Sequence, residues 1–306
     1  MAAIAKKSTY RPNGISGKSN FVFNLLFILY GVICVAPLLL VFIISITDSG
    51  SLAEKGYSFF PTHMNLSAYR FLFIDSTELF RAYGVTIFVC VVGTTLSVLL
   101  SILYAYPISR KSFKYRNFFA FYVFFTMLFS GGLVPWYILY TKYLHLNDNI
   151  MALIMPFLIN AYNILIAKTY FSNNIPEAVL ESAKIDGASE FKTFIKIVIP
   201  LSKPVIATIA LFTCLTYWND WYNTLLFITN KNLYNIQFSM YKALLAVEFL
   251  KSSRVASLSV TSELLKVPGE TVRMAMAIIG IGPIVFAYPF FQRYFIKGLT
   301  IGAVKG

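Results

Sequence analysis

Apolar residues gather along the chain into six long blocks that carry almost no charge. The hydrocarbon core of a bilayer is about 30 Å thick, so a helix of about 20 mainly apolar residues can cross it. Helices are expected in these blocks because every backbone amide must find a partner within lipid. The pattern therefore predicts an all-α membrane protein with six transmembrane helices. The predicted spans cover about residues 21–46, 82–109, 117–141, 149–170, 204–230 and 274–296.

These spans define one predicted transmembrane domain, residues 21–298, between two short tails, residues 1–20 and 299–306. Two predicted outer loops, residues 47–81 and 231–273, are long and mix both signs of charge. Short interfacial helices, contacts with an external partner and a plain solvated connection all stay open for these loops. Prolines are expected to kink the spans or to lie near their ends. They are Pro37, Pro107, Pro135, Pro156 and Pro289.

Composition strengthens the membrane assignment. Of the 306 residues, 58% are hydrophobic and 13% are charged, whereas soluble proteins carry roughly 25% charged residues. The net charge of +13 would also suit a nucleic-acid-binding protein. Here, however, the basic residues gather in loops on one predicted side of the membrane, which marks the cytoplasmic side. We therefore expect both termini in the cytoplasm and no nucleic-acid partner. The basic clusters are Lys6, Lys7, Arg11 and Lys18, then Arg110, Lys111, Lys114 and Arg116, then Arg293, Lys297 and Lys305.

Candidate chemistry within the spans is sparse. The three cysteines, Cys34, Cys90 and Cys214, lie in apolar blocks without a CxxC pair, and the chain has two histidines. This pattern predicts neither a disulfide framework nor a metal site. The HExxH, GxSxG and GxxxxGK[ST] motifs do not occur in the sequence. An intramembrane enzyme of those classes is therefore disfavoured, and ATP binding through a phosphate loop is not expected in this chain.

The connection between the fourth and fifth spans, residues 174–200, differs from the other cytoplasmic loops because its charges balance when Lys168 just before it is included. The acidic residues are Glu177, Glu181, Asp186 and Glu190, and the basic ones are Lys168, Lys184, Lys192 and Lys196. Pro176 suits the first turn of a helix, Gly187 suits a left-handed stop, and Ser189 suits the cap of a second helix. The segment therefore predicts two short helices joined by a tight turn. The second helix carries one apolar face at i, i+3, i+4 and i+7, made of Phe191, Phe194, Ile195 and Val198.

This stretch resembles the EAA signature of permease subunits in binding-protein-dependent ABC importers. The signature reads Glu-Ala-Ala, three residues, Gly, nine residues, Ile, one residue, Leu-Pro. The matching positions are Glu181, Ala183, Gly187, Ile197 and Pro200, whereas Ser182 replaces the central Ala and Ile199 replaces Leu. Further segments resemble the carbohydrate-uptake branch of that family, which is maltose-permease-like, and most of all its oligosaccharide and polysaccharide permeases. They are residues 130–135, 218–220, 288–292 and 302–306.

The resemblance implies the type I ABC importer permease fold, in which a cytoplasmic coupling helix docks on an ATPase subunit. It also implies a multi-pass protein of the bacterial cell membrane without enzyme activity or a cofactor of its own. The implied partners are a second homologous permease, two ATPase subunits that bind ATP and Mg, an external solute-binding protein, membrane lipid and a carbohydrate substrate. The implied ATPase-coupling residues are Glu181, Ala183, Asp186, Gly187, Ala188, Phe191, Phe194 and Pro200. Whether Phe191 and Phe194 contact the ATPase or pack against the helix ends stays open.

The fifth span contains the one acidic residue inside a predicted span, Asp220. Intramembrane ionisable residues are functional candidates, and aromatic, amide and carboxylate groups suit the rings and hydroxyls of sugars. The alternative is that Asp220 and Asn219 fix helix packing or gate the pore. The substrate-path candidates are Trp218, Asn219, Asp220, Trp221 and Asn223.

Two further hypotheses compete with a carbohydrate permease. A permease for another solute, such as a peptide or an amino acid, would carry the same EAA segment and is disfavoured only by the additional motifs. A stand-alone channel or secondary carrier would not need a charge-balanced turn with a fixed Glu–Gly spacing, and many carriers show inverted repeats. The sequence does not specify the sugar, its length or which permease subunit binds it.

Overall fold

The computed structural model describes residues 17–74, 76–251 and 269–303, with most side chains described through residue 285. Over these residues the chain is helical, and its extended pairing is one isolated antiparallel bridge between Thr47 and Met64. The α-helices are α1 (Gly17–Ser45), α2 (Ser49–Lys55), α3 (Ser67–Phe73), α4 (Ser76–Ser109), α5 (Arg116–Leu128), α6 (Leu133–Ile138), α7 (Met151–Ile154), α8 (Ala161–Asn174), α9 (Glu177–Ile185), α10 (Glu190–Thr193), α11 (Ile199–Leu201), α12 (Lys203–Trp218), α13 (Tyr222–Phe227), α14 (Ile236–Lys251) and α16 (Gly269–Ala303). The remaining turns are the π-helices η1 (Leu139–Tyr143) and η3 (Phe194–Val198) and the 3-10 helices η2 (Met155–Phe157) and η4 (Lys231–Leu233).

The predicted spans are only partly continuous helices. Residues 19–45 of α1 and 77–109 of α4 are each long and apolar enough to cross a membrane, and three bent helix pairs raise the number of candidate spans among the described residues to five. The helix α16 covers the sixth predicted block. The third, fourth and fifth predicted spans each contain a break. The third bends by 109° after α5, the fourth bends by 47° before α8, and the fifth breaks between α12 and α13.

Local chemistry explains these breaks. Gly132 has a φ of +85°, a backbone conformation that favours glycine, and it separates α5 from α6. The side chain of Asn160 accepts a hydrogen bond from the Asn163 N–H and caps α8. At the third break, the Asp220 carboxylate accepts the Asn223 N–H at 3.1 Å. Each break therefore has a residue that either tolerates an unusual φ or satisfies an exposed helix N-terminus.

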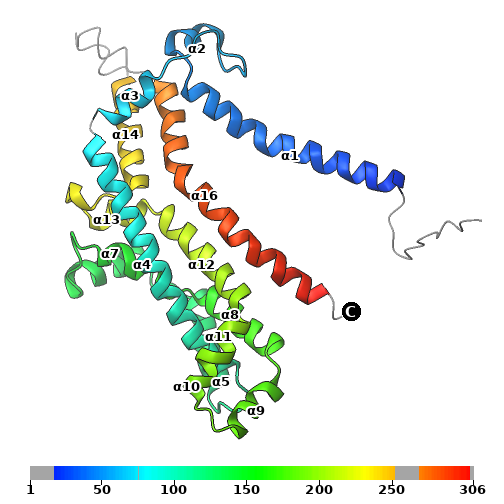
Figure 1. Cartoon of the computed structure of the whole chain (residues 1–306). Helices are drawn as coiled ribbons and strands as arrows, with labels where there is room; N and C mark the ends of the chain where they lie inside the picture. Colours follow the sequence, from blue (N-terminus) through cyan, green and yellow to red (C-terminus); the bar gives the residue numbers. More distant parts are fainter. Residues whose placement is uncertain (1–16, 75, 252–268, 304–306) are drawn as a thin grey trace, which may run out of the picture. The chain divides into compact units, whose positions relative to one another are not determined.

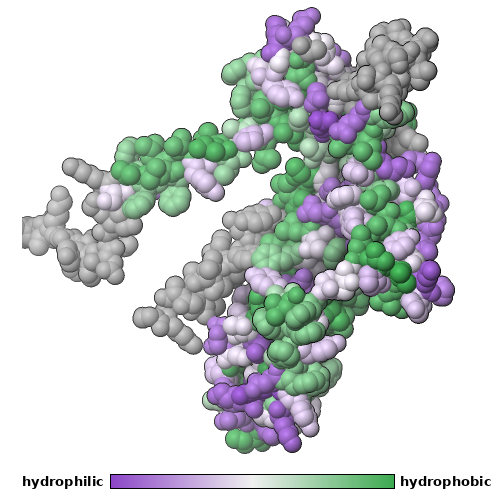
Figure 2. All heavy atoms as spheres, turned by 180° about the vertical axis from the view of Figure 1, so that it is seen from behind, coloured by the Kyte–Doolittle hydropathy of each residue, from purple (hydrophilic) through white to green (hydrophobic). Residues whose placement is uncertain are grey.

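The described chain forms two compact units, and the first comprises residues 1–71 and 268–278. Within the predicted outer loop 47–81, the Asp48 carboxylate accepts the N–H groups of Gly50 and Ser51 and caps α2. Apolar side chains cover the surface of α1, where Phe21 and Phe27 are 69% and 72% exposed, and Figure 2 shows this helix as a nearly continuous hydrophobic surface. Such a surface suits lipid or another apolar helix rather than water. The short helices α2 and α3 fit the interfacial-helix hypothesis for loop 47–81, and residues 252–268 of the other outer loop lie outside the described residues.

The second unit comprises residues 72–267 and 279–306. In it α4 packs along both α8 and α12 (Figure 1). Two clusters of buried residues hold these helices together. One cluster joins α4, α5, α8, α9, η3 and α12 and includes Ile102, Phe171, Leu180 and Val198. The other joins α4, η1, α7, α12 and α13 and includes Tyr140, Leu153, Tyr217 and Phe227.

An exposed carboxylate connects two turns of the second unit. Asp148 adopts a φ of +53°, which aspartate tolerates better than most residues. Its carboxylate accepts the Thr229 N–H at 2.6 Å, the Thr229 hydroxyl at 2.5 Å and the Asn230 N–H at 2.7 Å. Because the Asp148 N–H also donates to the Phe227 carbonyl at 2.9 Å, the turn before α7 is tied to the turn after α13.

The Asp148 contacts predict a pH dependence of stability. Hydrogen bonds from the Thr229 hydroxyl, and then from the N–H groups of Asn230 and Thr229, lower the pKa of Asp148 below its usual value. Stability from this carboxylate is therefore complete above the unfolded-state pKa of about 3.9 and is lost as the pH falls through the lower folded-state pKa. We expect Asp148→Asn to lower the melting temperature at neutral pH and to flatten its decline at acidic pH, measured in detergent from pH 7 to pH 3. Parallel melting curves for the variant and the parent at every pH would contradict this assignment.

Candidate functional site

The segment between α8 and α12 forms the predicted pair of short helices. Helix α9 begins at Glu177, so Pro176 lies at the cap position and not inside the first turn. At the other end Gly187 adopts a φ of +73°, as predicted for a left-handed stop. The Ala188 N–H donates to the Ala183 carbonyl at 2.9 Å and the Gly187 N–H donates to the Lys184 carbonyl at 3.1 Å. This pair of bonds is the Schellman motif, and it fixes the angle at which the chain leaves α9.

The second helix begins where predicted. The Ser189 hydroxyl accepts the Lys192 N–H and caps α10. Helix α10 continues through the π-helical turn Phe194–Val198 and the short α11. A bend of 79° then leads into α12. The segment therefore has rigid local geometry at both its turn and its exit.

Buried side chains hold this segment on the second unit. Leu180 of α9 and Phe194 and Val198 of η3 belong to the same buried cluster as Phe171 of α8 and Ile209 of α12. Because a fully buried apolar side chain stabilises a fold by about 1.5–3 kcal/mol, these three residues make the segment part of the body of the protein. Motion of the segment should therefore be transmitted to α8 and α12.

Polar contacts connect the segment to the end of α4. The Tyr106 hydroxyl donates to the Glu190 carboxylate at 2.9 Å, and the Tyr106 ring lies 5.1 Å from the Phe194 ring between centroids. Lys111 and Glu177 form an exposed ion pair at 3.1 Å. An exposed pair of this kind contributes little to stability, so Tyr106, which combines a hydrogen bond with ring packing, is the stronger of the two connections.

The outward side of the segment exposes both charge and apolar area. Glu181, Asp186 and Gly187 are exposed, as is Pro200, whereas Ala183 is buried and Ala188 is half-buried. Phe191 is 69% exposed and Ile185 is 86% exposed. Figure 2 shows hydrophilic side chains gathered at the end of the second unit that carries α9 and α10. The sequence analysis missed Ile185, although an isoleucine beside the Asp186-Gly187 turn was a visible signal.

The predicted apolar face of the second helix is only partly buried. Phe194 and Val198 are buried, while Phe191 and Ile195 are exposed. The polar Thr193 is also buried. The buried side of this helix therefore coincides only partly with its apolar face. Phe194 therefore packs within the protein, and Phe191 is the phenylalanine that a partner can reach.

This difference gives a matched pair of substitutions. Phe194→Ala should lower the free energy of unfolding by about 3–5 kcal/mol, because it leaves a cavity in the core. Phe191→Ala should change stability by less than about 0.5 kcal/mol, as is usual for surface positions, and should weaken binding of a cytoplasmic partner. Melting temperature and partner co-purification measure the two effects. Equal loss of stability in both variants would contradict the burial difference.

The substrate-path candidates are divided between the interior and the surface. Trp218 is buried, and its indole N–H donates to the Gly280 carbonyl at 2.8 Å. Asn223 is buried and donates from both its backbone and its side chain to the Asp220 carboxylate at 3.1 Å. The Asn235 amide donates to the Asp220 carbonyl. These contacts agree with the packing alternative, because each residue stabilises the break between α12 and α13.

Asn219 and Trp221 are exposed and line a cavity of about 390 Å³ together with one edge of Asp220. Phe157, Leu215, Thr216 and Tyr222 complete its wall. The Asn219 side-chain N–H donates to the Leu215 carbonyl at 2.9 Å, and this bond does not use the Asn219 side-chain oxygen. The sequence candidates thus include both residues that hold the break and residues that border open space.

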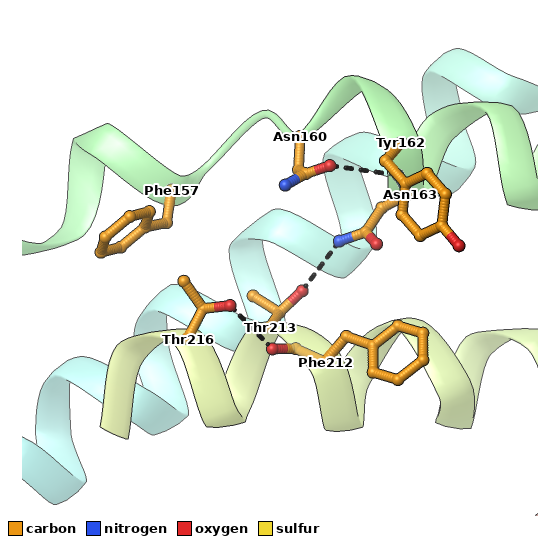
Figure 3. A pocket seen from close by; sticks show the side chains of 7 residues that line it. All are labelled: Phe157, Asn160, Tyr162, Asn163, Phe212, Thr213 and Thr216. Atoms are coloured by element: carbon orange, nitrogen blue, oxygen red, sulfur yellow. Dashed lines mark hydrogen bonds between the residues drawn. The ribbon is translucent and has the colours of Figure 1, made fainter. Parts of the chain in front are cut away.

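A second cavity of about 350 Å³ lies between α8 and α12 and shares Phe157 and Thr216 with the first. Its other residues are Asn160, Tyr162, Asn163, Phe212 and Thr213, and Figure 3 shows their side chains gathered around one opening. The sequence analysis missed this site. The signals were two asparagines three residues apart in an apolar block and two threonines with the same spacing in α12.

Comparisons with known proteins assign the chain to a family. The family model described as "Binding-protein-dependent transport system inner membrane component" matches residues 14–301. The polygalacturonan/rhamnogalacturonan transport system permease protein YtcP of Bacillus subtilis (strain 168) is 38% identical over 280 residues, which are 91% of this chain and 95% of that protein. Protein LplC of the same organism is 38% identical over 293 residues, 94% of this chain and 97% of that protein.

A solved structure agrees with these relatives. It is the crystal structure of a bacterial ABC transporter involved in the import of the acidic polysaccharide alginate, and one of its chains matches with a TM-score of 0.76. The match has 27% sequence identity and covers 92% of this chain and 100% of that one. The match over residues 14–301 and the identity to full-length permeases lead to one conclusion: this chain belongs to the family of inner membrane components of binding-protein-dependent transport systems.

Proposed function

We propose that this chain is a transmembrane subunit of an ATP-driven importer and forms the translocation path for a carbohydrate, most simply an oligosaccharide, delivered by an external solute-binding protein. Relatives named for polygalacturonan and rhamnogalacturonan transport and for arabinooligosaccharide transport support the substrate class. The partners in the proposal are a second homologous permease, two cytoplasmic ATPase subunits and the solute-binding protein. The complex lies in the bacterial cell membrane, with both termini of this chain in the cytoplasm.

Energy enters this subunit through residues 174–200 in the proposal. The observation that supports this proposal is that the segment has fixed local geometry, is anchored by buried side chains and still exposes other side chains at the surface. Leu180, Phe194 and Val198 anchor it in the core, while Glu181 and Phe191 remain exposed. ATP and Mg belong to the ATPase subunits, whose closure on ATP would move the docked turn.

The anchored segment transmits that displacement to the helices around the path. Its buried residues share one cluster with residues of α4, α8 and α12, and a close-packed interior moves between discrete arrangements instead of deforming continuously. Within the proposed assembly Glu181 supplies a polar contact to the ATPase, Phe191 and Ile185 supply apolar contact, and Gly187 sets the turn. Asp186, Ala188 and Pro200 shape the same segment.

The cavity between α8 and α12 and the adjoining cavity at the break between α12 and α13 give the path a surface suited to sugars. Their walls combine aromatic rings with amide and hydroxyl groups. Ligand sites of this size are mostly apolar with a few polar groups that fix orientation. Asn219, Asp220 and Trp221 are the substrate-path candidates that border a cavity, whereas Trp218 and Asn223 are buried beside the helix break.

Purification in mild detergent tests the proposal. The chain is expected to bring down a second permease and two ATPase subunits, and the reconstituted complex is expected to import an oligosaccharide only with ATP and the solute-binding protein. A complex that imports peptides or amino acids but no sugar would contradict the substrate class. A chain that moves solute without any ATPase partner, with residues 174–200 deleted, would contradict the proposal as a whole.

A further inference from the structure

We infer that the sugar unit seated against this subunit is uncharged and is recognised through its hydroxyl groups, and that a carboxylated unit is disfavoured there. The inference rests on the proposed function and concerns the cavity between α8 and α12 together with the adjoining cavity at the break between α12 and α13. It is not what the names of similar proteins suggest, because these include permeases for polygalacturonan and for the acidic polysaccharide alginate.

The α8 side of the cavity offers neutral hydrogen-bonding groups. The Asn160 carbonyl oxygen accepts the Asn163 N–H at 3.2 Å, so the Asn160 amide nitrogen keeps both of its donors for a ligand (Figure 3). The Tyr162 side chain lies at the same opening, and its hydroxyl can donate or accept. A sugar hydroxyl also donates and accepts, so it matches these groups without requiring a charge.

The α12 side offers acceptors. The Thr216 hydroxyl donates to the Phe212 carbonyl at 2.9 Å, and the Thr213 hydroxyl accepts from the Asn163 amide at 3.2 Å. The Thr216 oxygen therefore keeps acceptor capacity at the cavity wall. Phe157, Tyr162 and Phe212 supply aromatic surface around these groups, which suits the apolar face of a sugar ring.

Among the described residues that line the two cavities, Asp220 is the one carboxylate, and none is a lysine, an arginine or a histidine. Its carboxylate accepts hydrogen bonds from Asn223, which is neutral, so no cation offsets its charge in this pair. At a protein surface the effective dielectric constant is lower than in bulk water, so an unpaired charge acts more strongly there than in water. A uronate carboxylate entering these cavities would meet the like charge of Asp220 and no cationic side chain among the lining residues, whereas a neutral unit would meet no such repulsion.

Charged thiol reagents test the cavity directly in the assembled complex. A Thr216→Cys variant is treated with three methanethiosulfonate reagents, which carry a trimethylammonium group, no charge or a sulfonate. The rate at which each reagent modifies the introduced thiol is divided by the rate at which the same reagent modifies a small thiol free in solution. We expect the cationic reagent to react at least about tenfold faster than the anionic one on this scale. The parent complex is the control for Cys34, Cys90 and Cys214. Equal rates, a faster anionic reagent, or no reaction with any reagent would overturn the inference.

A second variant assigns the source of the charge effect. In Thr216→Cys combined with Asp220→Asn, the ratio of cationic to anionic rates should fall to about one. A ratio that stays above about tenfold would overturn the role given to Asp220. Oligosaccharide uptake by the parent complex is measured alongside. Import of no sugar at all would contradict the proposed function, while the reagent rates would still decide the charge selectivity of the cavity.

Ligand protection provides the matched chemical comparison. A 1,4-linked galacturonate tetramer and its fully methyl-esterified form differ in charge and share one backbone, so each is added before the uncharged reagent. Stronger protection of the Thr216→Cys thiol by the ester is expected. Stronger protection by the acid would overturn the inference and would leave the proposal of a carbohydrate path intact.

Discussion

A Gly187→Trp variant is expected to lose transport while the protein stays folded. Gly187 has a φ of +73°, and no atom lies within 4 Å of a Cβ added there. The cost to the isolated subunit is therefore backbone strain of about 1–2 kcal/mol, without a steric clash. The bulky side chain would instead project from the exposed turn that the proposed function places against the ATPase. Sugar uptake should fall to background while the melting temperature drops by only a few degrees.

The matched control is Gly187→Asn. Asparagine adopts the left-handed region more readily than other residues with a Cβ, and it is much smaller than tryptophan. Its uptake should stay within about threefold of the parent, since it keeps the turn with modest strain. ATPase co-purification and ATP hydrolysis are measured for both variants. Normal uptake by Gly187→Trp with its ATPase bound would rule out the docking assignment.

Replacing Gly93 by alanine should destabilise the pairing of α4 with α12. A Cβ at Gly93 would lie 2.4, 2.6 and 2.8 Å from three ring carbons of Tyr217, closer than carbon atoms can approach. The Tyr217 ring has little room to move because it is buried and its hydroxyl donates to the Ile154 carbonyl at 2.7 Å. Overpacking of this kind costs about 1–3 kcal/mol and exceeds the gain in helix propensity of about 1 kcal/mol. A lower melting temperature in detergent is the expected result.

The same helix provides the control, because a Cβ at Gly84 would meet no atom within 4 Å. Gly84→Ala should therefore leave stability unchanged or raise it by up to about 1 kcal/mol. A smaller residue opposite Gly93 should also relieve the clash, so Gly93→Ala combined with Tyr217→Leu should lose less than the sum of the two single losses. If Gly93→Ala and Gly84→Ala melted alike, the close contact between α4 and α12 would be refuted.

The turn between α9 and α10 illustrates what local sequence can predict. Gly187 and Ser189 were assigned as a left-handed stop and a helix cap, and both have those conformations and contacts. These features depend on a few neighbouring residues, because a positive φ and a side-chain cap are satisfied within one turn of chain. The family resemblance carried by Glu181, Gly187 and Pro200 was confirmed by the family match over residues 14–301.

The breaks in the spans were harder to predict because apolar composition is the same on both sides of them. Residues 117–141 have no charge, yet the chain turns by 109° within them. Gly131 and Gly132 permitted this turn without requiring it. Proline positions were equally ambiguous, since Pro37 and Pro107 lie inside continuous helices whereas Pro156 lies in the 3-10 turn beside a bend.

The sequence by itself determined the membrane class, the position of the exposed turn and the family, because hydrophobic blocks, glycine conformation and motif spacing are properties of contiguous residues. Only the tertiary structure decided that Phe194 is buried while Phe191 is exposed, and that Asn160, Tyr162 and Thr216 border one cavity. The burial of Phe194 and the position of the cavity depend on which side of each helix packs against its neighbours. These packing contacts join residues that lie tens of positions apart in the sequence. Periodicity identifies an apolar arc, but the packing partner decides which part of the arc is buried.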